Sequence, residues 1–379
     1  MKKLTTVGAV LLTTTSIAHA GGVERAVPSV GLLFEEGNYI EFSFGFVAPD
    51  VSGEQQFSVG PSAAGSSSGD MAEDYFQLGF GYKNDLTSDL SLAVIFDQPY
   101  GADVDYSSDT GYAYGGGVTA LGSLGSTASI DSNAVTVLGA YALPNNITVY
   151  GGGRAVRTEG EVALFNTYEM TTSSETNYGY VLGAAWERPE IAARVALTYH
   201  SEITHDFDSN ENGTDTEFST TLPQSWTLEA QTGIAADTLL FGSVRWVEWS
   251  AFDISPPEFA SAPGGGSLVD YEDDTTTYNL GVGRRFNDDW SGAVTVGYEA
   301  ANGGFSGNLG PTDGNTSLGV AATRTIDAVR ITGGLRYIWI GDAETEAPED
   351  FTGGTPGVTL GDFTDNSGLA AGIRVQYNF

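Results

Sequence analysis

The chain has 379 residues and a formal net charge of −34, because 49 acidic side chains face only 15 Lys and Arg. So few cations exclude the basic surface that nucleic acid requires, and the absence of cysteine excludes disulfide scaffolds, thiolate zinc sites and cysteine nucleophiles. Aromatic residues make up 11% of the chain, too many for a disordered acidic protein, and no apolar run is long enough for a transmembrane helix.

Residues 1–20 have the pattern of a secretory signal peptide. Lys2 and Lys3 precede an apolar stretch at 4–17, and Ala18 and Ala20 supply the small residues of a cleavage site after residue 20. We therefore expect the chain to leave the cytoplasm.

The rest of the chain shows a period-two alternation of apolar and polar residues, which is typical of β-strands with two different faces. Between residues 369 and 379, for example, Leu, Ala, Ile, Val, Tyr and Phe take one parity, and the other is mostly polar or small. Segments with this pattern begin near residues 39, 74, 89, 130, 146, 176, 190, 214, 237, 270, 289, 316, 328 and 367. An even number of antiparallel strands closes into a barrel with both chain ends on one side.

The connections between these segments differ in length. Those after even-numbered strands are short turns, whereas those after odd-numbered strands are mostly long and rich in Gly, Ser and Asp. Short turns on one side and long loops on the other are typical of outer-membrane barrels. The sequence therefore predicts an all-β fold: a 14-stranded antiparallel transmembrane β-barrel at 39–379 with a short N-terminal plug, or hatch, at 21–38.

A soluble sandwich or propeller is the alternative all-β fold. Such a fold would need a second layer to cover so many aromatic side chains, whereas lipid covers them directly. We therefore expect a monomer in the outer membrane of a Gram-negative bacterium, in contact with lipid and lipopolysaccharide.

Charged residues are distributed unevenly. Acidic clusters lie in the predicted loops and keep them solvated; the cluster at 208–213 opens like a calcium loop but has Ser219 where a bidentate Glu is required. Arginines instead take lumen-facing positions, among them Arg194, Arg245 and Arg336. They either hold an anionic head group or form ion pairs with lumen acids, and both interpretations stay open.

Catalysis has one possible starting point in the sequence. His200 and Ser201, with His205 and Asp206 nearby, are the residue types of a hydrolytic site. Nothing else supports such a site, and the glycine clusters lack the strand-to-helix context of a phosphate-binding loop. We therefore expect no enzyme activity, no cofactor and no metal.

Three stretches together resemble the FadL family of outer-membrane transporters for long-chain fatty acids and other hydrophobic compounds. The first is LSLAVIFDQPYGADVDY at 90–106. The second combines LPQSW at 222–226 with VRWVEWSAF at 244–252, and the third is YEDDTTTYNLGVGRRFNDDW at 271–290. The order and spacing of these stretches hold from about residue 27 to the end.

This resemblance implies a hatch that closes the barrel and a lateral exit through a kinked third strand. The kink would centre on Pro99, Tyr100 and Gly101, because proline lacks a donor and glycine weakens a strand. Family members carry a longer plug with an Asn-Pro-Ala element, whereas 26–29 is the nearest equivalent here.

The sequence thus predicts a passive channel for fatty acids or other hydrophobic small molecules. The expected site residues are an apolar hatch (Val30, Leu32, Leu33, Phe34), a lateral gate (Pro99, Tyr100, Gly101), carboxylate anchors (Arg194, Arg245, Arg336) and an outer capture loop with Tyr112 and Tyr114. The alternatives are a general diffusion porin for polar solutes and a structural or adhesive barrel.

Overall fold

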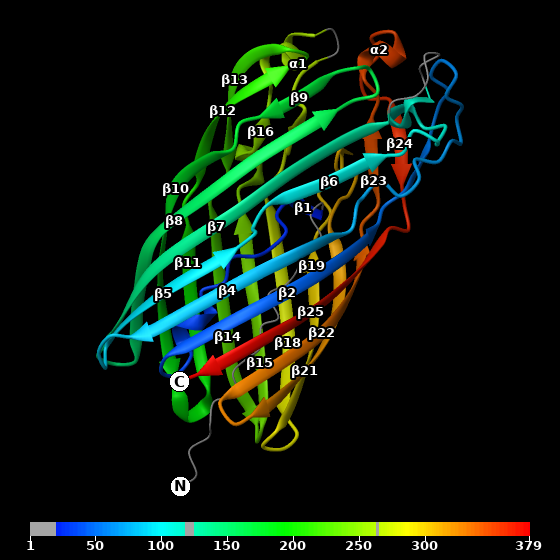
Figure 1. The fold of residues 1–379 in the computed structure, drawn as a ribbon. Coiled ribbons are helices and arrows are strands. Elements are labelled where there is room, and N and C mark those ends of the chain that lie inside the picture. Colours follow the sequence, from blue (N-terminus) through cyan, green and yellow to red (C-terminus); the bar gives the residue numbers. More distant parts are fainter. Residues whose placement is uncertain (1–19, 118–124, 263–264) are drawn as a thin grey trace.

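The computed structural model of the protein describes residues 20–117, 125–262 and 265–379. The predicted signal peptide lies outside these residues except for its last one. Within the described residues, fourteen antiparallel strands pair in a closed cycle, in which β25 returns to pair with β2. The predicted 14-stranded barrel is therefore confirmed (Figure 1). In order, the strands are β2 (Tyr39–Asp50), β4 (Tyr75–Asp85), β5 (Leu90–Asp97), β7 (Ser126–Leu143), β8 (Ile147–Ala163), β10 (Glu175–Arg188), β11 (Ala193–His200), β14 (Ser225–Ala235), β15 (Thr238–Val247), β18 (Thr275–Arg285), β19 (Trp290–Glu299), β21 (Asn315–Ile326), β22 (Val329–Ile340) and β25 (Ser367–Asn378).

Shorter elements lie before the barrel or on its loops. The strands are β1 (Ala20–Val23), β3 (Gly53–Gln55), β6 (Gly101–Tyr106), β9 (Glu169–Thr172), β12 (Ile203–Glu211), β13 (Thr214–Leu222), β16 (Asp253–Ile254), β17 (Val269–Asp270), β20 (Phe305–Ser306), β23 (Ala343–Glu346) and β24 (Thr359–Phe363). The helices are α1 (Pro257–Ser261) and α2 (Glu349–Thr352), with helical turns at Gly31–Phe34, Ala113–Gly117, Pro189–Ile191 and Trp249–Ala251. No helix in the described part of the chain is long and apolar enough to cross a membrane.

The predicted eighth strand, near residue 214, is wrong. Residues 214–222 form β13, which pairs with β12 as a hairpin outside the barrel cycle, and the eighth barrel strand is β14, paired with β11 and β15. The reason is visible in the sequence, because β13 carries polar residues on both faces and has no continuous apolar face for lipid.

The outer face of the barrel is apolar. Phe76, Tyr178 and Leu280 are 62%, 77% and 60% exposed, and they share their parity with the other aromatic and aliphatic residues of their strands. Exposed apolar area on this scale requires a hydrocarbon environment, which the bilayer provides.

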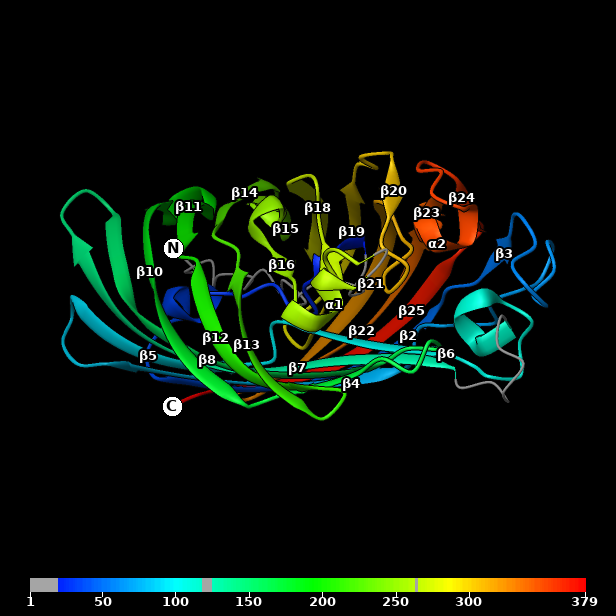
Figure 2. The ribbon, with the colours of Figure 1, turned by 90° about the horizontal axis from the view of Figure 1, so that it is seen from above.

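The two ends of the barrel differ as the loop lengths predict. The C-terminus lies at the end with the short turns, and α1, α2 and the β12–β13 hairpin lie at the opposite end (Figure 1). Several short turns place Asn or Asp in the left-handed region, such as Asn145 (φ 67°) and Asp237 (φ 58°), which suits tight hairpins. From above, the helical turn at Gly31–Phe34 lies within the ring of strands (Figure 2).

Candidate functional site: a gap in the barrel wall and an apolar lumen

The third barrel strand is interrupted between β5 and β6. β5 pairs with β7 as far as Asp97, opposite Ala134, and pairing resumes at Gly101, opposite Asp131. Three residues (98–100) therefore face two residues of β7, which defines a β-bulge. The extra residue reverses the parity, so that odd-numbered residues face the lumen in β5 and even-numbered residues do so in β6.

This bulge leaves a gap in the wall between β4 and β6. β4 pairs with β5 only from Phe80 onward, so 75–79 are not paired with the third strand. Beyond the gap, the outer edge of β6 is paired again, because Glu73 N donates to Asp103 O at 3.1 Å. We call the gap between 75–79 and 98–102 the lateral window.

Side chains satisfy the backbone groups that the window leaves unpaired. Gln98 Oε1 accepts from Leu78 N at 2.8 Å, across the gap. On the other side, Ser132 Oγ accepts from Tyr100 N at 2.8 Å and donates to Tyr100 O at 2.6 Å. Because buried backbone groups without partners are costly, these bonds make the interruption a stable feature of the wall.

The N-terminal segment lies against the window. The amides of Arg25 and Ala26 donate to Pro99 O at 2.8 and 3.2 Å, and Gln77 Nε2 donates to Arg25 O at 2.6 Å. The segment therefore bridges the two strands that no longer pair with each other.

The two charged residues of this segment, Glu24 and Arg25, are bound to two different strands. Arg25 passes over the ring of Tyr75, 4.2 Å from its centroid, and its Nη2 lies 2.6 Å from Asp103 Oδ2. Glu24 forms two bonds with the guanidinium of Arg245 on β15, at 3.0 and 2.6 Å, and both side chains are buried. Arg25 thus lies across the end of the window at Tyr75 and Gly101.

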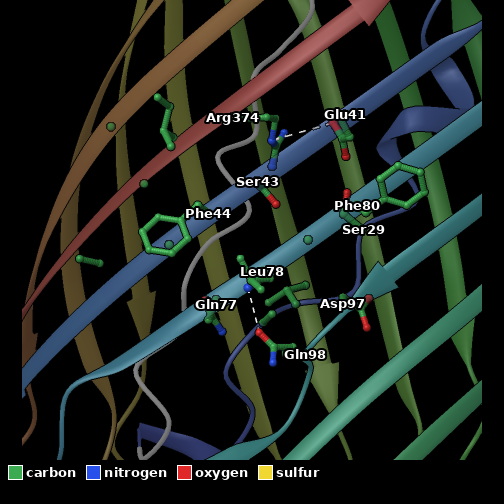
Figure 3. Close-up of a pocket in the computed structure, with 18 of the residues that line it drawn as sticks. Ser29, Glu41, Ser43, Phe44, Gln77, Leu78, Phe80, Asp97, Gln98 and Arg374 are labelled. Carbon is green, nitrogen blue, oxygen red and sulfur yellow. Dashed lines mark hydrogen bonds and ion pairs between the residues drawn. The ribbon is translucent and has the colours of Figure 1, made fainter.

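A cavity of about 100 Å³ lies beside the window (Figure 3). Its lining includes lumen-facing residues such as Glu41 and Gln77 together with lipid-facing residues such as Phe44 and Leu78. It therefore reaches both faces of the barrel wall.

A second cavity, of about 70 Å³, lies inside the outer half of the barrel. We call it the inner pocket. Its apolar lining includes Ile130, Val162, Phe207, Phe218 and Phe252. Among the described residues that line it, none is Lys or Arg, so the pocket suits an uncharged apolar molecule.

Aromatic side chains cover the outer end of the lumen. Tyr106 stacks on Tyr112 with ring centroids 5.5 Å apart, and Tyr114 lies 5.6 Å from Tyr106. Tyr112 is fully buried, so of the two predicted capture residues only Tyr114 is partly exposed. An apolar layer thus connects the outer loops with the interior.

Glu211 joins the β12–β13 hairpin to the loop that carries α1. Its carboxylate accepts from Tyr168 Oη, Thr216 Oγ1 and Phe259 N at 2.8, 2.6 and 3.0 Å. Burial raises the pKa of Glu211, but these hydrogen bonds outweigh burial and hold the pKa below its usual value.

The predicted hatch residues lie together at the short-turn end of the lumen. Val30, Leu32 and Leu33 are buried in one cluster with lumen-facing residues of β5, β7, β8, β10 and β11, and Phe34 packs against its edge. The domain boundary between hatch and barrel remains a prediction.

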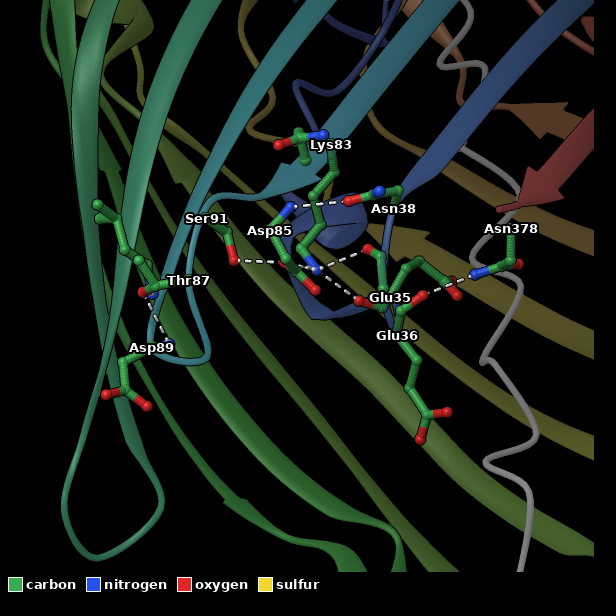
Figure 4. A network of polar contacts seen from close by, with 12 residues as sticks. Glu35, Glu36, Asn38, Lys83, Asp85, Thr87, Asp89, Ser91 and Asn378 are labelled. Carbon is green, nitrogen blue, oxygen red and sulfur yellow. Dashed lines mark hydrogen bonds and ion pairs between the residues drawn. The ribbon is translucent and has the colours of Figure 1, made fainter.

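Polar contacts fix the end of the hatch (Figure 4). Lys83 Nζ donates to the carbonyls of Glu35 and Gly37 at 2.8 and 3.1 Å, and Asn378 Nδ2 donates to Glu36 O at 2.9 Å. Arg330 Nη2 lies 2.6 Å from Glu35 Oε2. Side chains of β4, β22 and β25 therefore hold the same short segment.

The three predicted anchors differ in their surroundings. Arg245 is engaged by Glu24, and the Cζ of Arg194 lies 4.4 Å from the ring centroid of Phe34. Arg336 lines the cavity beside the window and takes part in none of the ion pairs found within the described residues. The structure therefore does not gather these residues into one anion site.

A family model described as "Outer membrane protein transport protein (OMPP1/FadL/TodX)" matches residues 32–379. The chain belongs to the FadL/TodX family. Its members are barrels of the Gram-negative outer membrane, which confirms the predicted family and location. A comparison with curated proteins finds no match.

Solved structures of this family share the fold. A Pseudomonas aeruginosa FadL homologue has a TM-score of 0.72 and 13% identity, with 92% of each chain covered. The Pseudomonas putida toluene transporter TodX has a TM-score of 0.64 and 11% identity, with 95% of this chain and 96% of that chain covered. The Ralstonia pickettii toluene transporter TbuX has a TM-score of 0.59 and 14% identity, with 92% and 90% covered.

The residues that hold the N-terminal segment at the window were not predicted from the sequence. Glu24 and Arg25 lie in the predicted hatch but were not singled out, and Ser132 and Gln98 carry no local signal because their partners are distant in sequence. The available signal was Arg25, which is the only cation in the predicted hatch and directly follows Glu24. The histidines of the possible hydrolytic site are buried separately, in β11 and β12.

Proposed function

We propose that this chain mediates the passive uptake of hydrophobic small molecules and releases them sideways into the bilayer through the lateral window. The supporting observation is the bulge at 98–100, which separates β6 from β4 and leaves a cavity that reaches both faces of the wall. An apolar molecule that leaves through the wall enters hydrocarbon without crossing water, which is the favourable direction.

The proposed path has three parts. Tyr114 and the other apolar residues of the outer loops capture the molecule, the inner pocket receives it, and the window at Pro99, Tyr100 and Gly101 releases it. Because Arg25 crosses the window, release requires the N-terminal segment to move aside. The hatch residues Val30, Leu32, Leu33 and Phe34 close the short-turn end, so that the molecule does not continue into the periplasm.

Fatty acids belong to this proposal only if the wall provides a cation for the carboxylate. The inner pocket offers none among its described residues, whereas Arg336 lies beside the window. We therefore propose uncharged hydrophobic molecules as the principal cargo, with Arg336 as the carboxylate anchor if fatty acids use the same exit.

Repair of the bulge tests the proposal. Deleting Gln98 and introducing Pro99→Thr and Gly101→Thr removes the extra residue and restores the donor and the strand propensity at the interruption. Uptake of toluene and oleate by cells that lack other transporters of the family should fall to the background, while heat-modifiable migration in gels shows an intact barrel.

Pro49→Thr in β2 is the matched control, because Pro49 lies in a strand that is paired on this stretch with Gly368 of β25. It should leave uptake unchanged. Undiminished uptake in the repaired barrel would place the exit elsewhere. A large steady conductance of the unmodified protein in planar bilayers would instead favour a diffusion porin.

A further inference from the structure

Within the described part of the chain, three polar atoms of the inner pocket have no partner at hydrogen-bond geometry, although the backbone of Ile203 also interacts with the His205 ring. They are Thr158 Oγ1 on β8, His205 Nδ1 on β12 and Thr220 Oγ1 on β13. The three residues are only 7%, 1% and 6% exposed, so water does not reach them freely. Because buried polar groups in native proteins are usually paired, three unpaired atoms around one apolar cavity require an explanation.

The topology brings these residues to one place. His205 and Thr220 are direct partners in the β12–β13 ladder. His205 Nε2 lies 3.1 Å from Val156 O on β8, the strand that carries Thr158. The three side chains thus line the same cavity from three neighbouring strands.

The chemistry of the three atoms is complementary. Nε2 of His205 lies within hydrogen-bond distance of Val156 O, and the backbone of Ile203 interacts with the same ring. A carbonyl oxygen only accepts, so we assign the neutral tautomer in which Nε2 donates to Val156 O and Nδ1 is left as an acceptor. Each threonine hydroxyl both donates and accepts. A hydroxyl group in the pocket could donate to Nδ1 and accept from a threonine.

Charge excludes anions from this position. The only charged residues in the lining are Glu159 and Glu161, as far as the described residues show. A carboxylate or a phenolate would enter an apolar cavity without a cation, which is costly.

From these observations we infer that the inner pocket binds uncharged hydrophobic compounds that carry one hydroxyl or carbonyl group, such as phenols and apolar alcohols, through Thr158, His205 and Thr220. This inference rests on the proposed function and specifies its cargo. The cavity is about 70 Å³, against about 150 Å³ for an engineered cavity that binds benzene, so a ring enters only if flexible side chains such as Met170 move.

The test compares two molecules of nearly the same shape. p-Cresol is the tyrosine side chain with a methyl group in place of its main-chain link, and it is neutral at pH 7 because its pKa is about 10. p-Xylene replaces the hydroxyl by a methyl group. Equilibrium dialysis of the full-length mature protein in detergent, with each compound radiolabelled, measures both affinities, and partition into micelles is the same for all variants.

Thr158→Val combined with Thr220→Val keeps the side-chain shape and removes both hydroxyls. We expect p-cresol affinity to fall about tenfold, which corresponds to ~1.4 kcal/mol, while p-xylene affinity is unchanged or rises. His205→Phe should weaken p-cresol binding in the same direction. If the double variant does not fold, Thr220→Val alone provides the comparison.

Thr204→Val with Thr221→Val is the matched control, since these exposed hydroxyls bond to each other at 3.0 Å on the same hairpin. It should leave both affinities unchanged. Equal binding of p-cresol to the unmodified protein and to the pocket variants would overturn the inference and indicate that only water occupies the polar atoms. If neither compound binds the unmodified protein, the proposed function itself fails.

Discussion

The contact between Arg25 and Asp103 should control how often the lateral window opens. Arg25→Gln removes the charge and the guanidinium over Tyr75 but keeps the first part of the aliphatic chain and a polar end. The Arg25 side chain is 8% exposed and the Asp103 side chain is 31% exposed, so solvent screens the pair only partly.

The size of the effect follows from this burial. A hydrogen bond between charged groups contributes about 1.5–3 kcal/mol, and partial screening of Asp103 reduces this to about 1–2 kcal/mol. A change of one to two kcal/mol shifts an equilibrium roughly 5–30-fold. If opening limits uptake, the initial rate of toluene uptake by cells should rise by that factor.

Three further variants complete this test. Asp103→Asn should have a similar effect, and the double variant should add little, because both single changes remove the same contact. Arg188→Gln is the control, since Arg188 forms an exposed pair with Glu190 at 3.7 Å. An unchanged or lower uptake rate in a correctly folded Arg25→Gln protein would refute the idea that this pair closes the window.

Three other predictions concern the window, its cavity and the outer loops. Ser132→Ala leaves the N–H and C=O of Tyr100 unpaired, so the free energy of unfolding in urea and detergent should fall by about 1–3 kcal/mol. Arg336→Gln should lower oleate uptake but not toluene uptake; equal loss of both would remove its role as a carboxylate anchor. The pKa of Glu211 is lower in the folded protein than in the unfolded chain, where it is about 4.3. The ionised carboxylate therefore stabilises the fold fully above that pH, and this stabilisation is lost as the pH falls through the folded pKa. Hydrogen-exchange protection of the α1 loop should therefore decrease at low pH, and Glu211→Gln should show low protection at every pH.

The barrel could be predicted from the sequence because each transmembrane strand repeats the same two-faced pattern. The exception is the hairpin of β12 and β13, in which polar residues interrupt the apolar face. Its apolar positions, among them Phe207 and Phe218, face the lumen rather than lipid. Alternation alone does not show whether the apolar face of a strand contacts lipid or lines the lumen.

The site was predictable only in outline. Pro99 and Gly101 mark the interruption locally, because each residue type weakens a strand by itself. The added residue in the register, the hydroxyl of Ser132 and the Glu24–Arg245 contact depend on partners in other strands. Contacts of this kind follow from the three-dimensional pairing and leave no pattern in a single sequence.

Reversible closure of the window tests lateral release most directly. The chain contains no cysteine, so Leu78→Cys with Gln98→Cys introduces the only two thiols, on opposite sides of the window. A short bis-methanethiosulfonate joins them and a reducing agent removes it. Leu228→Cys with Val244→Cys, which are direct partners in intact wall, is the control.

The measurement is the rate of toluene uptake before crosslinking, after it and after reduction. If release passes through the window, uptake stops in the Leu78 and Gln98 pair, returns on reduction, and stays constant in the control pair. Full uptake through the crosslinked window would contradict lateral release.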